Sequence, residues 1–329
     1  MHFEKSIGCF WGGAYGDTLG ATVEFMYLSE IRERYGQQGI TIPEPTFGHV
    51  VPVITDDTQM AIATAVGLNG VPIDKRHNLS VIRWSLWEAY QAWLQTQTDP
   101  AQCRAPGTTC LAALRGGIMG SRQKPINDSG GSGGIVRAHP VGIAFRDDPA
   151  LAFEVGMESA CLTHGNPKGY VPAGVLAALI AFLYRGFTLG DALGSVYDLL
   201  KALPAHERVA TLVAIKSSLM APLHGDQGMF IDSFVGQSGE KGGGWLGHDA
   251  LAIALYAVRA ALRDPLAAVR IAVNHSGDSD STGSLAGALA GVMHGPRPFE
   301  RELQRLGLWL ERAEELRTQA LSLACYQVS

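Results

Sequence analysis

Apolar residues recur at spacings of three and four along most of the chain, which is the pattern of helices that bury one face. Alanine and leucine are common in these stretches and add intrinsic helix preference. The run DALAIALYA, at residues 249–257, is an especially strong helix former. The pattern predicts helices at residues 4–21, 57–68, 79–95, 109–120, 149–162, 171–185, 189–202, 207–220, 247–262, 265–274, 282–293 and 300–322.

Strand patterns are scarce by comparison. Only Val50–Thr55 contains a run of β-branched residues, and Pro52 interrupts it, so we expect at most a minor β hairpin. No repeat of 20–50 residues and no linker divides the chain. The sequence therefore predicts an all-α fold, a compact orthogonal helical bundle in which residues 1–329 form a single domain.

Prolines and glycines indicate where elements begin and where long loops lie. Pro149, Pro172 and Pro265 are near predicted helix starts, where proline is tolerated. Two glycine-rich irregular stretches cover residues 124–140 and 236–247. Loops of this length in a compact helical domain are usually functional or disordered.

Glycines also recur inside two predicted helices at a strict spacing of four. Each glycine inside a helix costs roughly 1 kcal/mol relative to alanine, so two such rows need a compensating reason. A spacing of four places each row along one ridge, which would let the helix backbones pack unusually close. We expect both helices to lie at the centre, against each other or against close neighbours. The rows are Gly8, Gly12, Gly16 and Gly20, and Gly283, Gly287, Gly291 and Gly295.

Composition and charge narrow the classes of function. Hydrophobic residues make up 47% of the 329 residues, enough for a substantial core. The formal net charge of −5 and the lack of a dense Lys/Arg run argue against nucleic-acid or anionic-membrane binding. The longest apolar stretches, such as Val171–Tyr184 and Ser284–Met293, are shorter than the roughly 20 residues of a membrane span.

The cysteines and the N-terminus bear on the compartment. Five cysteines are scattered without C-x-x-C spacing, which is typical of a reduced environment. The opening stretch MHFEKSIGCFWGG contains an acidic residue and little of the positive charge of a secretory signal. We therefore expect a cytoplasmic protein. The cysteines are Cys9, Cys103, Cys110, Cys161 and Cys325.

Two acidic clusters carry the strongest chemical signal, TDDT at residues 55–58 and GDSDSTG at residues 277–283. Either cluster alone could simply cap the helix that follows it. Brought together, however, four carboxylates would repel one another unless cations lay between them. Carboxylate and hydroxyl oxygens suit Mg²⁺, Mn²⁺ or Ca²⁺. Because Asp57 and Asp278 are 221 positions apart, a shared metal site requires one folded unit.

The motifs and their order resemble those of the ADP-ribosylglycohydrolases over residues 8–295. Residues 16–25, GDTLGATVEF, look like the opening G-D-x-L-G-x-x-x-E motif of the family. The two acidic clusters look like its T-D-D-T and G-D-[ST]-D-[ST] motifs. Further similar segments are residues 127–140, similar to S-x-G-N-G-x-x-M-R-x-x-P, the step Leu162-Thr163-His164, and residues 244–250.

The resemblance implies a central site for two divalent cations, Mg²⁺ or Mn²⁺, in an all-α fold. It implies catalytic roles for Asp56 and Asp57, and for Glu24 on a segment over the metals. A solvated glutamate is the alternative for Glu24, and Asp17 is expected to hold a loop through backbone hydrogen bonds. The metal ligands implied by the resemblance are Thr55, Asp56, Asp57, Asp278, Asp280 and Ser281.

The resemblance also implies that a glycine loop cradles phosphates and ribose, since glycines let backbone N–H groups point at anions. A flexible linker is the alternative. Ser132 and Val136 replace the family's usual Asn and Met, and Asp249 replaces a usual Glu. His164 and Trp245 could instead be ordinary core residues. The implied substrate-binding residues are Asn127, Ser129, Gly130, Gly131, Ser132, Gly133, His164 and Trp245.

The activity implied by the resemblance is hydrolysis of ADP-ribose from a protein side chain. The motif variants favour the arginine-directed branch, which cleaves an N-glycosidic bond. Alternatives are hydrolysis of O-linked ADP-ribose, either ADP-ribosyl-serine or O-acetyl-ADP-ribose, a non-catalytic ADP-ribose binder, and a two-metal phosphohydrolase. The expected partner is an ADP-ribosylated protein and the expected product is ADP-ribose, with no nucleic acid and no membrane span.

Overall fold

Helices make up almost all of the regular structure in the computed structural model, which describes residues 2–235 and 242–328. This confirms the predicted all-α class. Residues 236–241 of the second glycine-rich loop lie outside the described residues. The α-helices of the described chain are α1 (His2–Gly20), α2 (Leu28–Tyr35), α3 (Asp56–Asn69), α4 (Leu79–Thr96), α5 (Thr108–Arg115), α6 (His139–Ala144), α7 (Pro149–Cys161), α8 (Pro167–Tyr184), α9 (Leu189–Ala202), α10 (Ala205–Met220), α11 (Gln227–Val235), α12 (Gly247–Ala260), α13 (Pro265–Val273), α14 (Ser279–His294), α15 (Arg297–Leu306) and α16 (Ala313–Ala324), with 3-10 turns η1 (Ile73–Lys75) and η2 (Ser132–Gly134).

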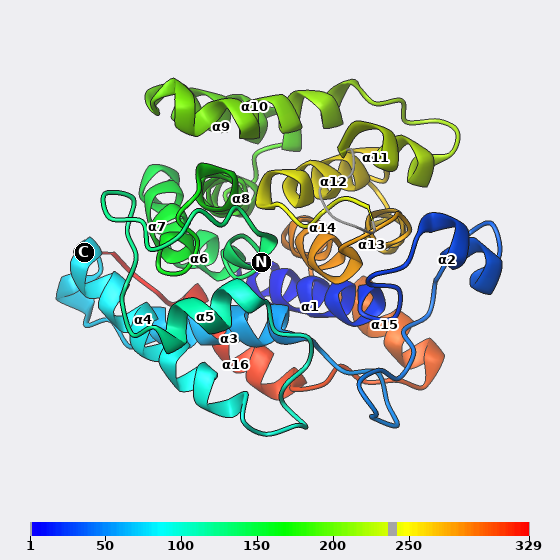
Figure 1. Ribbon diagram of the computed structural model, residues 1–329, viewed down its shortest axis with the longest axis horizontal. Coiled ribbons are helices and arrows are strands. Elements are labelled where there is room, and N and C mark those ends of the chain that lie inside the picture. The colour runs from blue at the N-terminus through cyan, green and yellow to red at the C-terminus, as the bar shows by residue number, and fades with distance from the viewer. Residues whose placement is uncertain (1, 236–241, 329) are drawn as a thin grey trace.

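The helices are arranged around one central pair, α1 and α14, which lie side by side in the middle of the molecule (Figure 1). Helices α8, α12 and α13 pack against α14, while α3 and α16 pack against α1. Helices α9 and α10 form an outer layer over α8 and α12, and α4 packs on α3 (Figure 1). Because α3 and α14 both contact α1, their N-terminal ends can meet at one place.

The two glycine rows bring the backbones of α1 and α14 into direct contact. A Cβ atom added to Gly12 would lie 2.1 Å from the carbonyl oxygen of Gly287. One added to Gly16 would lie 1.9 Å from the carbonyl oxygen of Gly283, so a side chain would overlap the facing backbone in both places. The expectation that these helices pack against each other at the centre is confirmed. The same close approach occurs between Gly8 and Gly291 and between Gly20 and Ser279.

Asparagine and aspartate side chains begin several of the surrounding helices. Asn78 and Asp264 each accept hydrogen bonds from two backbone N–H groups at the starts of α4 and α13, and Asp148 accepts one at the start of α7. Such caps satisfy donors that a helix start leaves without partners. Pro149 and Pro265 follow their caps directly, as the sequence predicts.

Several predicted helix boundaries are wrong. Pro172 lies inside α8 rather than near its start, because Asn166 caps the helix and Pro167 takes its first position. The helix predicted at residues 300–322 is two helices, because Gly307 adopts a left-handed φ of 67° and ends α15.

Short elements also differ from the predictions. Helices α2, α6 and α11 were not predicted, since six to nine residues are too few to show a repeated apolar spacing. The helix predicted at residues 109–120 stops at Arg115, before the left-handed Gly117. No strand forms at Val50–Thr55, and among the described residues only two isolated bridges occur, at the site.

Helix α8 is longer than the apolar stretch predicted from the sequence. Its 18 residues are apolar enough to cross a membrane by length and composition, but 83% of them are buried inside the fold. A helix that is apolar on all sides also fits the centre of a large helical core. Helices α6, α7, α10 and α12 cover it from several directions.

Candidate metal centre and ligand-binding loop

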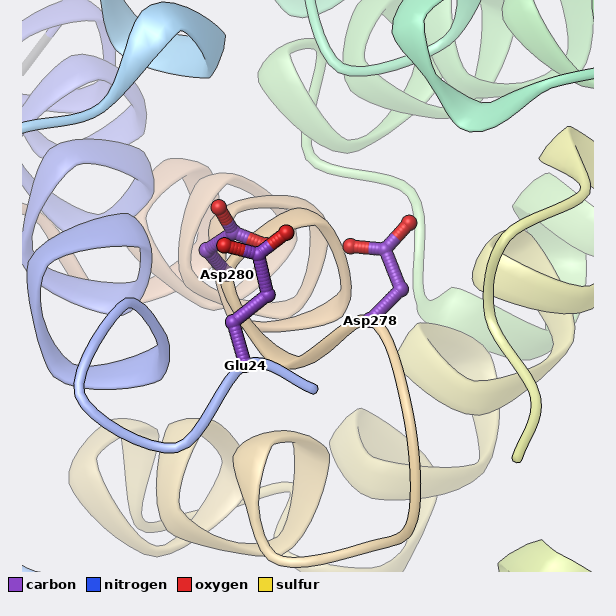
Figure 2. Close-up of side chains that lie close together, drawn as sticks. All are labelled: Glu24, Asp278 and Asp280. Carbon is purple, nitrogen blue, oxygen red and sulfur yellow. The ribbon is translucent and has the colours of Figure 1, made fainter. Parts of the chain in front are cut away.

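Three carboxylates converge beside the start of α14 (Figure 2). Glu24, Asp278 and Asp280 each offer an oxygen atom, and these atoms lie within 4.8 Å of one another. Glu24 comes from the segment after α1, whereas the two aspartates begin α14. Several carboxylate oxygens at this separation form the kind of donor set that hard divalent cations take.

The first turn of α3 joins this group through a hydrogen bond. Ser281 Oγ donates to Asp57 Oδ2 at 2.9 Å, which links the two acidic clusters directly. Asp56 and Asp57 lie outside the 4.8 Å group, but the charge of Asp280 raises the pKa of both, after burial. The expectation that distant parts of the chain bring these clusters together is therefore met.

Helix capping explains only one of the two clusters. The Thr55 hydroxyl accepts a hydrogen bond from the Asp57 N–H at 3.2 Å and so caps α3. Asp278 occupies the N-cap position of α14 but makes no side-chain cap bond there. Its Oδ2 instead accepts a hydrogen bond from Ser132 Oγ at 2.8 Å, so this carboxylate faces the glycine loop.

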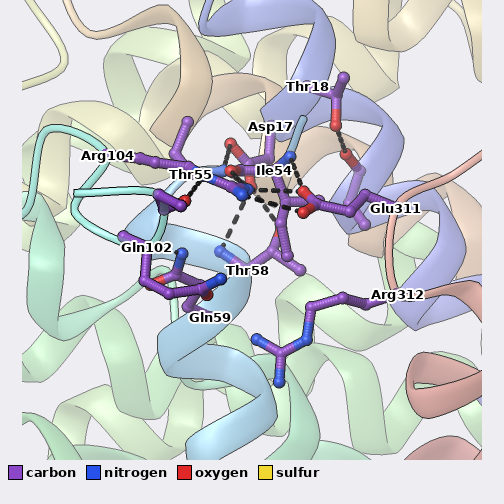
Figure 3. Close-up of polar contacts among 12 residues, drawn as sticks. Asp17, Thr18, Ile54, Thr55, Thr58, Gln59, Gln102, Arg104, Glu311 and Arg312 are labelled. Atoms are coloured by element: carbon purple, nitrogen blue, oxygen red, sulfur yellow. Dashed lines mark hydrogen bonds and ion pairs between the residues drawn. The ribbon is translucent and has the colours of Figure 1, made fainter. Parts of the chain in front are cut away.

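Asp17 holds the segment that leads into α3 (Figure 3). Its carboxylate accepts hydrogen bonds from the Thr55 N–H at 3.0 Å and the Thr58 N–H at 3.3 Å, and also from the Thr58 hydroxyl. These contacts match the loop-holding role expected for Asp17. They join α1 to α3 and fix the backbone that carries Asp56 and Asp57.

A buried ion pair that the sequence did not predict supports the same segment (Figure 3). Arg104, whose side chain is 2% exposed, contacts both carboxylate oxygens of Glu311 at 2.5 and 2.9 Å. Arg104 also donates to the carbonyl of Ile54, while the Ile54 N–H donates to Glu311 at 3.0 Å. No local motif could show this pairing, because the two residues are 207 positions apart.

The acidic centre lacks internal charge compensation. Burial raises the pKa of Asp57 and Asp280 well above the ordinary value, and neighbouring carboxylates raise it further. Burial, then the charges of Asp280 and Asp278, raise the pKa of Glu24 to about 11. Bound cations would remove this repulsion, so the residues present fit a divalent-cation site.

The glycine loop is held against the acidic centre by backbone hydrogen bonds. Ser132 N–H donates to the carbonyl of Trp245 at 2.9 Å, and Gly247 N–H donates to the carbonyl of Gly130 at 2.9 Å. Together with the bond from Ser132 to Asp278, these contacts place the loop beside the carboxylates. The serine that replaces the family's usual asparagine is thus in direct contact with a predicted metal ligand.

Asn127 braces the beginning of this loop. Its side chain donates to the carbonyl of Thr163 at 2.8 Å and accepts from the N–H groups of Ser129 and Gly165, each at 3.0 Å. Each polar atom of the amide is therefore engaged within the chain. Ser129 Oγ lies 3.0 Å from Thr109 Oγ1, so the loop is tied to α5 as well.

His164 lies beneath the glycines of the loop. Its Nδ1 is 2.8 Å from Thr163 Oγ1, and its side chain is 2% exposed. A Cβ atom on Gly131 or Gly133 would come within 3.6 Å of the imidazole, so these glycines leave room for it. Within residues 2–235 and 242–328, Nε2 has no hydrogen-bond partner.

Phe25 and Trp245 form an aromatic pair at the edge of the site. Their ring centroids are 5.1 Å apart with 28° between the planes. Phe25 directly follows Glu24 and has a left-handed φ of 66°, which is unusual for a bulky residue. Its N–H donates to the carbonyl of Gly277, and the Gly277 N–H donates back to Met26, each at 3.2 Å. Phe25 ends the stretch that resembles the opening motif, but its contact with Trp245 was not predicted.

His275 is fully buried two residues before the second acidic cluster. Its Nδ1 lies 2.9 Å from the Ser276 carbonyl, and its Nε2 lies 2.9 Å from Thr282 Oγ1. It thus supports the loop that carries Asp278. Asp232 of α11, a residue that the sequence did not single out, accepts hydrogen bonds from the Ser276 N–H and hydroxyl.

Comparison with known proteins finds relatives that are described as hydrolases of ADP-ribose linkages. A family model described as ADP-ribosylglycohydrolase matches residues 1–326. An ADP-ribosyl-[dinitrogen reductase] glycohydrolase from Rhodospirillum rubrum is 26% identical over 323 residues, covering 97% of this chain and 95% of the relative. An ADP-ribosylhydrolase ARH1 from Dictyostelium discoideum is 27% identical over 147 residues, covering 41% of this chain and 34% of that one.

A solved structure supports the fold independently. The chain superposes with a TM-score of 0.67 on a chain of an ADP-ribosylglycohydrolase-related protein complex. The two sequences are 24% identical, and the match covers 99% of this chain and 98% of the other.

Proposed function

The chain belongs to the ADP-ribosylglycohydrolase family, and we propose that it removes ADP-ribose from modified arginine side chains with the help of bound divalent cations. Hydrolytic removal of ADP-ribose follows from the family. The arginine linkage, the cations and the roles of individual residues are the proposal. The expected partner is an ADP-ribosylated protein, and the product is ADP-ribose.

One observation carries the proposal. Asp278 contacts the acidic centre on one side and the glycine loop on the other, through its proximity to Asp280 and its hydrogen bond from Ser132. A sugar bound at the carboxylates would therefore have a glycine-rich backbone beside it. This is the juxtaposition that a ribose linked to a diphosphate requires.

The proposed cation ligands come from both helix starts. We assign Mg²⁺ or Mn²⁺, and two ions, because four or more buried carboxylates can balance two divalent charges. When bound, such ions polarise ribose hydroxyls and activate water. The assigned ligands are Thr55, Asp56, Asp57, Asp278, Asp280 and Ser281, with Glu24 beside them.

Hydrolysis of the N-glycosidic bond requires a proton acceptor, groups that stabilise positive charge, and a proton donor. Asp56 or Asp57 accepts the proton of the attacking water. The remaining carboxylates stabilise the positive charge that develops on the ribose ring as the bond to C1 breaks. The leaving guanidine is strongly basic, so it departs with a proton supplied by a carboxylic acid beside the site. Glu24 is assigned to contact the substrate near the bond that breaks.

Arginine suits the edge of the site better than a hydroxyl side chain does. The Phe25 ring, which is 47% exposed, stacks on Trp245 next to Glu24. A guanidinium group stacks on aromatic faces and forms ion pairs with carboxylates, whereas serine has neither a flat face nor a charge. The five free cysteines also favour a reduced, cytoplasmic setting for such a reaction.

Mass spectrometry of products provides the test. Peptides with ADP-ribosyl-arginine or ADP-ribosyl-serine would be incubated with the enzyme in Mg²⁺, Mn²⁺ or EDTA. We expect release of intact ADP-ribose from the arginine peptide, dependent on the cation. Cleavage of the serine peptide alone would replace the arginine assignment. Binding of ADP-ribose without any cleavage would indicate a silent binder, and release of AMP or phosphate would indicate a phosphohydrolase.

A further inference from the structure

A chain of three buried groups runs beneath the glycine loop, from Arg137 through Thr163 to His164. Arg137 Nη2 donates to Thr163 Oγ1 at 2.6 Å, and Thr163 Oγ1 lies 2.8 Å from His164 Nδ1. The three side chains are at most 2% exposed, so water does not compete for these contacts. Their donor and acceptor roles are therefore set mainly by one another, and Cys110 is the neighbouring thiol that contacts Arg137 and Thr163.

The direction of each hydrogen bond follows from the chemistry of the groups. A guanidinium only donates, so the Thr163 oxygen must accept from Arg137. The threonine hydroxyl still has one proton to donate, and His164 Nδ1 is the partner recorded at hydrogen-bond distance. If Nδ1 carried a proton instead, Thr163 would receive two donors, and its own proton would be left with the sulfur of Cys110, which is a weak acceptor. Nδ1 therefore accepts, and a neutral His164 carries its proton on Nε2.

The Nε2 atom lies against the loop. A Cβ atom on Gly131 would be 3.4 Å from Nε2, and one on Gly133 would be 3.5 Å from it. Because no described residue accepts from Nε2, this buried side chain keeps one free donor directed at the place where a ligand would lie.

We propose that Arg137 and Thr163 are positioning residues that hold His164 in its Nε2–H tautomer, so that it donates a hydrogen bond to a phosphate oxygen on the glycine loop. This inference rests on the proposed function for the identity of the ligand, ADP-ribose. It goes beyond that function by assigning the tautomer and the two residues that set it.

Burial, and then the charge of Arg137, keep His164 neutral by lowering its pKa to about 3. Arg137 packs over the Tyr90 ring at 4.5 Å and donates to the Ser159 carbonyl, and within the described residues no carboxylate pairs with it. Its positive charge is therefore left to favour an anion on the loop above.

Nitrogen-detected NMR of histidine-labelled protein tests the tautomer directly. We expect His164 of the free wild-type protein to show a protonated Nε2 and an unprotonated Nδ1, without titration between about pH 5 and about pH 8. In Thr163→Val, which keeps the side-chain shape but removes the hydroxyl, the Nδ1–H form should become populated. Thr163→Ser, which restores the hydroxyl, should restore the wild-type pattern.

Calorimetric titration with ADP-ribose supplies the second readout. Thr163→Val should weaken binding about tenfold relative to the wild type, and Thr163→Ser should bind within about twofold of it. A thermal melt of each variant checks that it is folded. If Thr163→Val does not fold, the spectrum of the wild type still decides, because a protonated Nδ1 there contradicts the inference.

The inference and the proposed function can fail separately. Cleavage of ADP-ribosyl-arginine by a wild-type enzyme with the wrong tautomer would overturn only the role of Arg137 and Thr163. So would unchanged ADP-ribose affinity in a folded Thr163→Val. The predicted tautomer and affinity loss, in a protein that cleaves no ADP-ribosyl peptide, would support the positioning role while contradicting hydrolysis.

Discussion

The Ser281 hydroxyl donates a hydrogen bond to Asp57 Oδ2 at 2.9 Å, although the two residues are 224 positions apart. This bond joins the N-terminal turn of α14 to that of α3. Both helix starts are further held by α1, through the glycine contacts of α14 and the hydrogen bonds from Thr55 and Thr58 to Asp17. The aspartates of the acidic centre are thus held at the starts of packed helices, whereas Glu24 lies on the segment after α1.

Replacing Asp57 by asparagine should lower turnover and raise the melting temperature of the cation-free protein. The amide can still accept the Ser281 hydrogen bond but adds no charge, so turnover should fall by about 100-fold or more. In EDTA the variant should melt at a higher temperature than the wild type, because one repelling buried charge is gone. Turnover assays and thermal melts measure the two effects.

Asp74→Asn is the matched control, since the Asp74 side chain is 74% exposed and, among the described residues, pairs with its neighbour Lys75. It should change neither turnover nor the melting temperature measurably. Full activity of Asp57→Asn at limiting cation concentration would contradict the assigned role.

Cation binding should stabilise the protein more as the pH rises. Burial and then the charge of Asp280 raise the pKa of Asp17 to about 7, and the pKa values of Asp57 and Asp280 are also raised. The folded, cation-free protein therefore holds more protons than the unfolded chain above about pH 4, and loses stability as the pH rises toward about 7 and beyond. Cations can take the place of these protons.

The measurement is the difference in melting temperature between Mg²⁺ or Mn²⁺ and EDTA, from about pH 5 to about pH 8. We expect it to grow to roughly 5 °C. Burial lowers the pKa of His139 to about 4, which destabilises the fold as the pH falls below about 6.5, but this contribution cancels in the difference. A difference that is constant or shrinks with pH would contradict a cation site at these carboxylates.

Alanine substitutions should distinguish the central glycines from peripheral ones. Gly12→Ala places a methyl group 2.1 Å from the Gly287 carbonyl oxygen, so α1 and α14 must move apart. We expect a loss of roughly 1–3 kcal/mol in the free energy of unfolding, or no folded protein. Gly194→Ala in α9 meets nothing within 4 Å and should add about 0.5–1 kcal/mol. Denaturant titration measures both, and equal effects would refute the close packing.

The pair between Arg104 and Glu311 should matter for both stability and the site. Glu311→Gln leaves the Arg104 charge buried and unpaired, so the free energy of unfolding should fall by about 2–4 kcal/mol. Cation affinity should weaken as well, because Glu311 also holds the Ile54 N–H just before α3. Glu315→Gln, which affects a more exposed pair with Arg312, should cost less than about 0.5 kcal/mol. Denaturant titration and cation titration measure the two effects, and a loss confined to Glu315→Gln would contradict the assignment.

Much of this molecule could be predicted from the sequence because its signals are local or strictly periodic. Apolar spacing gave the long helices, and the four-residue glycine rows gave the contact between α1 and α14. Motif order gave the family and the acidic residues. Short helices such as α11 were not predicted, because few residues show little periodic signal. The division of residues 300–322 at Gly307 was not predicted either.

Other features depended on the tertiary structure alone. Pairings such as Arg104 with Glu311, the stack of Phe25 on Trp245, and the contact of Ser132 with Asp278 have no signature in local sequence. Each depends on which side chains the packed helices bring together and on the exclusion of water around them. The sequence by itself determined which residues could do chemistry and that the fold is helical. Three-dimensional packing decided which of them meet, because burial and proximity set donor direction, charge and pKa.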